Sequence, residues 1–247
     1  MTTTIEGFDV SSHNAPSSVP WSGARFGFVR VSHGLGLDTR ALEHLSRAHA
    51  AGVSCLGAYH YLRGDRTGYE QARAFWARVE QLEAGLVPLA LAVDLEDLPP
   101  PAPAWSRKVY AQRAADFVRE LAVLIPGRPC AVYGSPGYLE ALALPADARG
   151  PLWAAHWGVE RPMVPKGWSA WAIHQHAVTD GLDRNRFAGS AEDWGTVFGL
   201  RPLSYDVLGG TVTAIQRAAG GTPEHYESHD EGPVIGGATG KDGGDGQ

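Results

Sequence analysis

The feature that most constrains this chain is an alternation of short apolar runs with longer amphipathic segments through its first half. The runs have the length and composition of strands, and the segments between them have helical spacing. The runs are IEGFDVS, FGFVRVS, CLGAYHYL, PLALAVDLE and CAVYGSP, and the helical segments are residues 39–51, 68–84, 106–125 and 137–143. Strands that alternate with helices predict βαβ units and a parallel sheet.

The segment from Ser106 to Ile125 is the clearest of the expected helices. Ser106 is expected to cap its N-terminus, because a Ser hydroxyl can accept a backbone N–H of the first turn. Apolar residues recur through it at helical spacing, namely Val109, Tyr110, Ala114, Phe117, Leu121 and Leu124. By contrast, the link SHNAPSSVPWSG between the first two strands is too rich in Pro and Ser for more than a turn or two of helix.

After Leu144 the pattern changes, and LWAAHW, WAIHQHA and GLDRNRF follow with no helix-length segment between them. Five βα-type units followed by three strands with little helix are enough strands to close a barrel. We therefore predict a single-domain α/β barrel over residues 1–200. Residues 201–220 are expected to add a short strand or helix on its outside, and the Gly-rich polar residues 221–247 to be a flexible, disordered tail.

Composition excludes several classes of protein. The 247 residues are 44% hydrophobic and 19% charged, which is typical of a globular chain. The formal charge of -6 argues against nucleic-acid binding, and no apolar run approaches the ~20 residues of a membrane span. The first residues have no basic and apolar segments of a signal peptide. Cys55 and Cys130 lie in apolar segments and are expected to be free, buried thiols.

The stretch LALAVDLED raises the question of why a buried strand should end in three acids. Residues i and i+2 of a strand point to one face, about 6.5–7 Å apart, so Asp94 and Glu96 should project together and Leu95 the other way. Ala90 and Ala92 share the face of the two acids, which suits a narrow barrel interior that opens into a polar mouth.

Two other expected strands carry an acid at a comparable place, Asp9 in GFDVSS and Asp183 in GLDRNRF. If the first, fourth and last strands close one barrel, these acids converge with Asp94 and Glu96 at its mouth. Like charges at close range raise the pKa of at least one carboxyl, and a protonated acid beside an ionised one is what glycosidic bond cleavage needs. A D-x-E pair alone is equally compatible with solvated, salt-bridged or metal-binding carboxylates.

With these residues identified, the chain resembles glycoside hydrolase family 25, the lysozymes. The resemblance covers residues 5–198 and rests on six ordered motifs, GFDVSSHN, FGFVRVSHG, LGAYHYL, LALAVDLED, LWAAHWG and GLDRNRFAGS. It implies an irregular TIM-like (β/α)5(β)3 barrel. It also implies cleavage of the β-1,4 bond between N-acetylmuramic acid and N-acetylglucosamine in the glycan strands of peptidoglycan.

The resemblance implies a role for each acid. Glu96 corresponds to the general acid, Asp94 to the partner carboxylate that stabilises positive charge, and Asp9 and Asp183 to supporting acids. Direct attack by water and prior attack by the substrate's acetamide both stay open. Aromatic rings near strand ends can stack on sugars or simply pack in the core. The candidate substrate-binding residues are Tyr59, Tyr133, Trp153, Trp157 and His174.

The departures from the family pattern concern the walls of the expected cleft. Arg30 and His33 stand where Lys and Glu are usual, Trp157 stands for a Tyr, and His174, Gln175 and His176 replace a W-Q-Y strand. Six histidines lie near expected strand ends, but no H-E-x-x-H motif is present, and no metal or cofactor is expected.

Two other functions are compatible with such a barrel, a chitinase-like N-acetylglucosaminidase and a catalytically inactive glycan-binding barrel. No nucleic-acid or membrane partner is expected. With no visible leader, the protein is expected to reach the cell wall after holin-dependent release, by particle delivery or by an unseen secretion route. The C-terminal tail is a candidate tether to a phage tail or injection particle.

Overall fold

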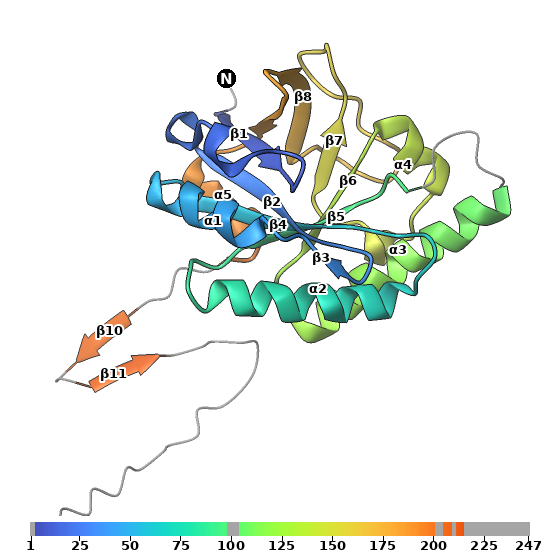
Figure 1. Ribbon diagram of the computed structural model, residues 1–247. Coiled ribbons are helices and arrows are strands. Elements are labelled where there is room, and N and C mark those ends of the chain that lie inside the picture. The colour runs from blue at the N-terminus through green and yellow to red at the C-terminus, as the bar shows by residue number, and fades with distance from the viewer. Residues whose placement is uncertain (1–2, 98–103, 201–204, 209–210, 215–247) are drawn as a thin grey trace, which may run out of the picture. The chain divides into compact units, whose positions relative to one another are not determined.

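The structure is a computed structural model in which residues 3–97, 104–200, 205–208 and 211–214 are described (Figure 1). Its main sheet has nine strands in the order β1-β9-β8-β7-β6-β5-β4-β2-β3, and a further β1–β2 pairing closes it into a barrel. The barrel strands are β1 (Ile5–Val10), β2 (Phe26–His33), β4 (Cys55–Tyr61), β5 (Ala90–Asp94), β6 (Cys130–Gly134), β7 (Leu152–Ala155), β8 (Ile173–Thr179) and β9 (Leu182–Phe187). The two-residue β3 (Gly36–Leu37) only extends the edge of β2.

Helical segments follow the first five barrel strands, as 3-10 turns after β1 and as one α-helix after each of β2, β4, β5 and β6. Two short 3-10 turns, Pro16–Ser18 and Trp21–Gly23, link β1 to β2. The helices α1 (Ala41–Ala50), α2 (Gly68–Glu83), α3 (Ala104–Leu124) and α4 (Pro136–Leu142) then precede β4, β5, β6 and β7. No helix links β7, β8 and β9 within the described chain. The predicted (β/α)5(β)3 arrangement is confirmed.

The last strand of the barrel runs against the others. β8 is parallel to β7, whereas β9 pairs antiparallel with both β8 and β1. Asp180 and Gly181 form the two-residue turn between β8 and β9, with φ of 56° and 73°. An Asp-Gly pair with both φ values positive is typical of the hairpin turn that matches strand twist. The Asp-Gly pair therefore indicates a hairpin, which the alternation of apolar runs by itself does not predict.

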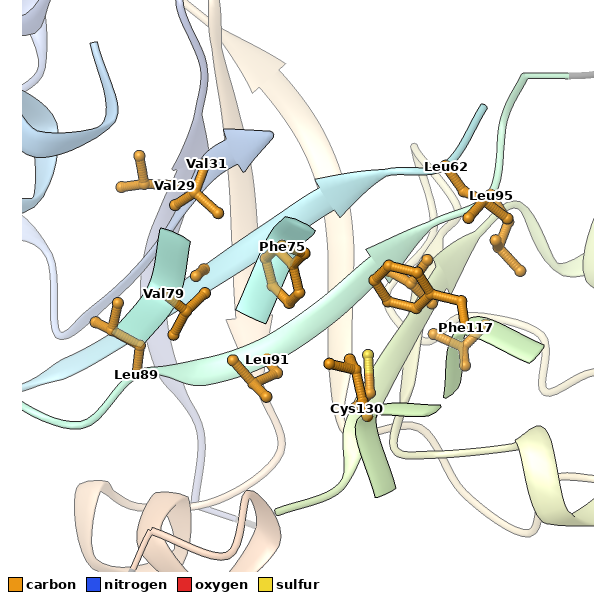
Figure 2. Close-up of a cluster of buried hydrophobic side chains, with 14 of the residues drawn as sticks. Val29, Val31, Leu62, Phe75, Val79, Leu89, Leu91, Leu95, Phe117 and Cys130 are labelled. Carbon is orange, nitrogen blue, oxygen red and sulfur yellow. The ribbon is translucent and has the colours of Figure 1, made fainter. Parts of the chain in front are cut away.

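Side-chain alternation along the strands divides the core into two layers. One layer lies between the strands and the helices, where Figure 2 shows Phe75 of α2 and Phe117 of α3 against the outer faces of β4, β5 and β6. The other fills the barrel with aromatic rings that include Phe26, Phe28 and Trp153. Gly57 makes room for them, since a Cβ there would lie 2.3 Å from the Phe28 ring.

One helix was missed by the sequence analysis. The helix α5 (Ala191–Val197) follows β9, and its N-terminus has a capping box between Ser190 and Asp193. Trp194 and Phe198 pack inside the barrel against a cluster of rings, Phe26, Phe28 and Phe187. This cluster lies at the end of the barrel opposite the C-terminal ends of the parallel strands. The segment SAEDW carried the signal, because Ser followed by an acid three residues later is typical of a helix start.

Helix α3 corrects two details of the prediction. It begins at Ala104, so Ser106 lies within its first turn and is not the cap residue. Val109 and Leu124 are exposed, whereas Tyr110, Ala114, Phe117 and Leu121 are buried. Helical spacing identified the buried stripe but also included residues on its margins.

The remaining predictions concern the cysteines and the C-terminal residues. Cys55 and Cys130 are free and buried, as predicted. Strands β10 (Tyr205–Leu208) and β11 (Thr211–Ala214) form an antiparallel pair within the expected extension. Residues 221–247, expected to be a flexible tail, lie outside the described residues. Among the helices that are described, none is long and apolar enough to cross a membrane.

The close contact between α2 and α3 gives a test of the fold. A Cβ on Gly68 would lie 2.0 Å from the backbone oxygen of Arg113 and 2.6 Å from the backbone nitrogen of Phe117. Because backbone atoms cannot yield as a flexible side chain can, Gly68→Ala should lower the free energy of unfolding by about 1–3 kcal/mol in chemical denaturation. The control Gly137→Ala on α4 meets nothing within 4 Å and should not be destabilising. Equal stability of the two variants would contradict this packing.

Candidate active site

The C-terminal ends of the parallel strands surround a cavity of about 380 Å³. Side chains reach it from all around the barrel, because every strand turns alternate residues inward. Its lining includes Asp9 of β1, Arg30 of β2, Tyr59 and Tyr61 of β4, Asp94 of β5, Tyr133 of β6, Trp153 of β7, Gln175 of β8 and Asp183 of β9. Ser11, His13, Glu96 and Trp157, which follow strand ends, complete it.

The end of β5 has the geometry that the D-x-E spacing predicts. Ala90 and Ala92 belong to the interior layer, and Leu95 is fully buried in the layer under the helices. The backbone N–H of Leu95 donates to the oxygen of Tyr133, which continues the strand direction past Asp94. Asp94 and Glu96 therefore both line the cavity, Asp94 buried and Glu96 exposed at the mouth.

The four predicted acids do converge. Asp9 and Asp183 are directly opposite in the β1–β9 pairing, and both line the cavity with Asp94 and Glu96. One part of the reasoning was wrong, since Asp183 was expected at the end of its strand. It lies near the beginning of β9, and it reaches the mouth because β9 is antiparallel to its neighbours.

The third acid of the stretch LALAVDLED has a different position. Asp97 is not among the residues that line the cavity. Its carboxylate forms an ion pair with Arg63 at 2.8 Å and accepts the backbone N–H of Gly64. Asp97 therefore holds the loop after β4 to the end of β5, so that crowding of charge at the mouth involves two of the three acids.

Burial and mutual repulsion raise the pKa of both interior acids. Burial raises the pKa of Asp9 to about 7, with a further increase from the charge of Asp183 and a smaller one from Glu96. The pKa of Asp94 is raised well above its usual range by burial, then by the charges of Glu96 and Asp9. The two side chains are only 8% and 7% exposed, so water does little to stabilise their charged forms.

The two acids nearer to solvent are affected in the same direction. Partial burial raises the pKa of Glu96, and the charge of Asp183 raises it further. Partial burial also raises the pKa of Asp183. The pKa of all four carboxyls is therefore raised, chiefly by burial, and the expected repulsion between the acids adds to this at Asp9, Asp94 and Glu96.

An arginine that the sequence analysis noted only as a departure lies in the same cavity. Arg30 forms an ion pair with the buried Asp38 at 3.0 Å, and its Nη2 donates to Ser12 Oγ at 2.8 Å. Its positive charge acts to lower the pKa of Asp94, against the larger effects that raise it. Among the described residues that line the cavity, Arg30 is the sole arginine or lysine.

Two amide side chains that received no role from the sequence bind Asp9 directly. Gln175 Nε2 donates to Asp9 Oδ2 at 2.9 Å, and Asn185 Nδ2 donates to the same oxygen at 2.6 Å. Both hydrogen bonds act to lower the pKa of Asp9. The signal for Asn185 was its place two residues after Asp183, which puts it on the same face of the strand.

The aromatic candidates for substrate binding differ in how far their side chains are exposed. Tyr59, Tyr133 and Trp153 line the cavity. Each is more than nine-tenths buried, so these three side chains form the walls of the cavity. Trp157 is 59% exposed at the rim. Trp157 is thus the residue of this group with an open ring face.

His174 is not where the sequence analysis expected it. It is fully buried on the outer face of β8, and its Nε2 donates to the backbone oxygen of His156 at 2.7 Å. Ile173 and Gln175 on either side of it point into the barrel, so alternation turns His174 away from the cavity. Within the described chain, no group of three or more His, Cys, Asp or Glu side chains could hold a metal ion.

Carboxyls with raised pKa values, gathered at the mouth of a (β/α)5(β)3 barrel, include the pair of acids by which most glycoside hydrolases act. The model of the family "Glycosyl hydrolases family 25" matches residues 8–183, so the chain belongs to this family and is a glycoside hydrolase.

Similar proteins agree with this assignment. The chain is 28% identical over 221 residues to "Lysozyme M1" of Streptomyces globisporus, which covers 77% of this chain and 70% of that protein. The crystal structure of the bacterial lysozyme from Streptomyces coelicolor has a TM-score of 0.64 at 25% identity, over 81% of this chain and all of that one. A family GH25 lysozyme from Aspergillus fumigatus, 24% identical, shares the fold with a TM-score of 0.66 over 79% of this chain and 99% of that one.

The raised pKa of Asp9 predicts a pH-dependent cost to stability. In the unfolded chain this carboxyl loses its proton near its ordinary value of 3.8, and in the folded protein near about 7. The folded state therefore binds more protons between these values, and stability falls as pH rises through this window. Asp9→Asn removes the charge but keeps an oxygen for the two amide donors. At about pH 8 it should be more stable than the wild type by about 2–4 kcal/mol in chemical denaturation.

The control is Asp65→Asn, which neutralises an exposed carboxyl outside the cavity. Its stability should follow that of the wild type from about pH 4 to pH 8. A wild-type stability that stays level or rises across this range, relative to Asp9→Asn, would show that Asp9 is ionised in the folded protein well below neutral pH.

Proposed function

We propose that this chain is a lysozyme that hydrolyses the β-1,4 bond between N-acetylmuramic acid and N-acetylglucosamine in peptidoglycan. The observation that carries the proposal is the pair Asp94 and Glu96 at one edge of the cavity, with Asp9 and Asp183 opposite. Membership of glycosyl hydrolases family 25 and the likeness to lysozymes support the choice of substrate.

Glu96 is the general acid in this proposal. A general acid must hold its proton at the working pH and reach the oxygen of the leaving sugar. Partial burial and the charge of Asp183 raise the pKa of Glu96, which favours the first requirement. It is exposed at the mouth, where a glycan strand that is too long to enter the barrel can still reach it.

Asp94 is the partner carboxylate. Its Oδ1 is buried and has no hydrogen-bond partner among the described residues. An unpaired buried oxygen is costly unless a ligand supplies the partner. We assign this oxygen to the substrate, as an acceptor for the N–H of the N-acetyl group or as a negative charge beside the developing oxocarbenium ion. Arg30 assists by favouring the ionised form of Asp94.

Asp9 and Asp183 act on the pair through their charges. Asp9 raises the pKa of Asp94, and Asp183 raises the pKa of Glu96. When charged, each supporting acid opposes ionisation of one member of the pair, and Arg30 offsets this at Asp94, so that the two members have different surroundings. The sugar contacts follow from exposure, with Trp157 as the stacking ring and Tyr59, Tyr133 and Trp153 as walls.

Delivery to the wall stays a prediction. Release by a holin and attachment to a phage tail or injection particle through residues 221–247 are both consistent with the composition of the chain. The proposed tether lies outside the described residues. Truncation after Leu200, with activity and particle association measured together, tests it.

Replacement of Glu96 tests the assignment of the general acid. Glu96→Gln removes the proton that the leaving oxygen needs but keeps the size of the side chain, so kcat on purified peptidoglycan should fall by about 10²–10⁴-fold. Binding to the same peptidoglycan in a sedimentation assay should persist. The matched control Glu140→Gln lies exposed on α4 and should retain full turnover.

Three outcomes of this assay separate the alternatives. Activity on chitin but none on peptidoglycan would replace the proposal with the chitinase-like function. Wild-type binding without cleavage of either polymer would make the protein a glycan-binding barrel. Full activity of Glu96→Gln would assign proton donation to another of the four acids.

The pH profile tests the role of Asp183. Asp183→Asn removes a negative charge that raises the pKa of Glu96, so the general acid should lose its proton at lower pH. The basic limb of kcat/KM against pH should therefore move to lower pH. Asp180→Asn neutralises an exposed acid in the same hairpin and should leave the limb in place. A limb that stays or moves upward in Asp183→Asn would refute the coupling.

A further inference from the structure

The hydrogen bonds on Asp9 fall on one of its two oxygens. Asn185 Nδ2 and Gln175 Nε2 both donate to Oδ2, at 2.6 and 2.9 Å, and neither donates to Oδ1. A carboxyl oxygen has two lone-pair positions, and two donors occupy both of them. The proton of the neutral acid is then confined to Oδ1.

This arrangement requires each amide to keep one orientation, and a tryptophan enforces it in both cases. Trp153 Nε1 donates to Asn185 Oδ1 at 2.8 Å, and Trp157 Nε1 donates to Gln175 Oε1 at 2.9 Å. An indole N–H can only donate, so the amide oxygen must face the indole. The amide nitrogen is left to face Asp9.

The two tryptophans differ in their exposure. Trp153 is 2% exposed inside the aromatic layer, so Asn185 is held by the core itself. Trp157 is 59% exposed at the rim. Tyr133 also donates to Gln175 Oε1, at 3.0 Å, but a hydroxyl can accept as well as donate and so permits either amide orientation. The orientation of Gln175 therefore depends on Trp157.

We infer that Trp157 is a positioning residue, whose indole N–H fixes the amide of Gln175 and thereby confines the proton of Asp9 to Oδ1. This inference rests on the proposed function for its catalytic meaning. A sugar that stacks on the open face of Trp157 holds that side chain in place. Binding of a sugar at the rim is thus linked to the position of the proton on Asp9 inside the cavity.

The link matters because Asp9 shares its cavity with other titratable groups. The carboxyls of Asp183, Asp94 and Glu96 share its cavity, together with Arg30 and His13 and the three tyrosines of the wall. A neutral Asp9 removes one repulsion from Asp94 and so favours the ionised form that the reaction requires. If Gln175 inverts, its oxygen faces Asp9 and accepts a hydrogen bond from the protonated carboxyl, which stabilises the neutral acid further.

The test is the titration of Asp9 in Trp157→Phe, which keeps a stacking ring but removes the N–H. The carboxyl carbon of Asp9, labelled with ¹³C and assigned by comparison with Asp9→Asn, is followed by NMR against pH. Loss of one hydrogen bond to the charged form should move its midpoint upward by about 1 pH unit relative to the wild type. Because Trp157 is largely exposed, the variant is expected to fold, and its near-UV spectrum verifies this.

The control is Trp168→Phe, which makes the same chemical change at an indole that donates to the backbone oxygen of Gly150, before the start of β7. Its Asp9 midpoint should match the wild type. A midpoint in Trp157→Phe that is unchanged or lower would overturn the inference, as happens if a water molecule replaces the indole donor. An equal shift in Trp168→Phe would also overturn it.

The titration does not depend on turnover, so the two proposals fail separately. A wild-type protein that leaves peptidoglycan intact but shows the upward shift in Trp157→Phe refutes the proposed function and supports the positioning role. An active wild type without the shift does the reverse.

Discussion

The antiparallel pairing of β9 with β1 is the interaction on which the rest of this structure depends. It closes the barrel, and its register sets Asp183 opposite Asp9 and brings Asn185 within 2.6 Å of the Asp9 carboxylate. A parallel last strand would have turned the same residues toward the other end of the barrel. The site exists because one strand reverses direction through a two-residue Asp-Gly turn.

Closure of the barrel brings four carboxyls together, and the surrounding side chains change the pKa of each carboxyl to a different extent. Burial raises the pKa of all four acids and repulsion raises it further at Asp9, Asp94 and Glu96, whereas amide donors at Asp9 and the charge of Arg30 near Asp94 act in the opposite direction. Each acid receives a different combination of these effects. Differences in pKa between neighbouring acids allow one to act as a general acid beside another that is ionised. The aromatic walls exclude water and so make these differences larger. The tryptophan–amide pairs add orientation to this balance.

Much of the fold and part of the site could be predicted because they depend on local patterns. Apolar runs gave all the barrel strands, and the i, i+2 rule placed Asp94 and Glu96 together. The failures are residues whose surroundings come from elsewhere in the chain. His174 looked like a cleft residue until its neighbours Ile173 and Gln175 took the inward face. The short α5 is stabilised by the aromatic interior that it enters, and a window of sequence does not contain that interior.

The sequence by itself determined which side chains share a face of each strand, since backbone geometry sets that period without help from other segments. Tertiary structure alone decided which strands are neighbours across the barrel and which donors reach Asp9, whereas the Asp-Gly pair before β9 already indicated that this strand reverses. Gln175 and Asn185 lie 166 and 176 residues away from it along the chain. Partners so distant meet only when the whole barrel closes, because no local periodicity relates them.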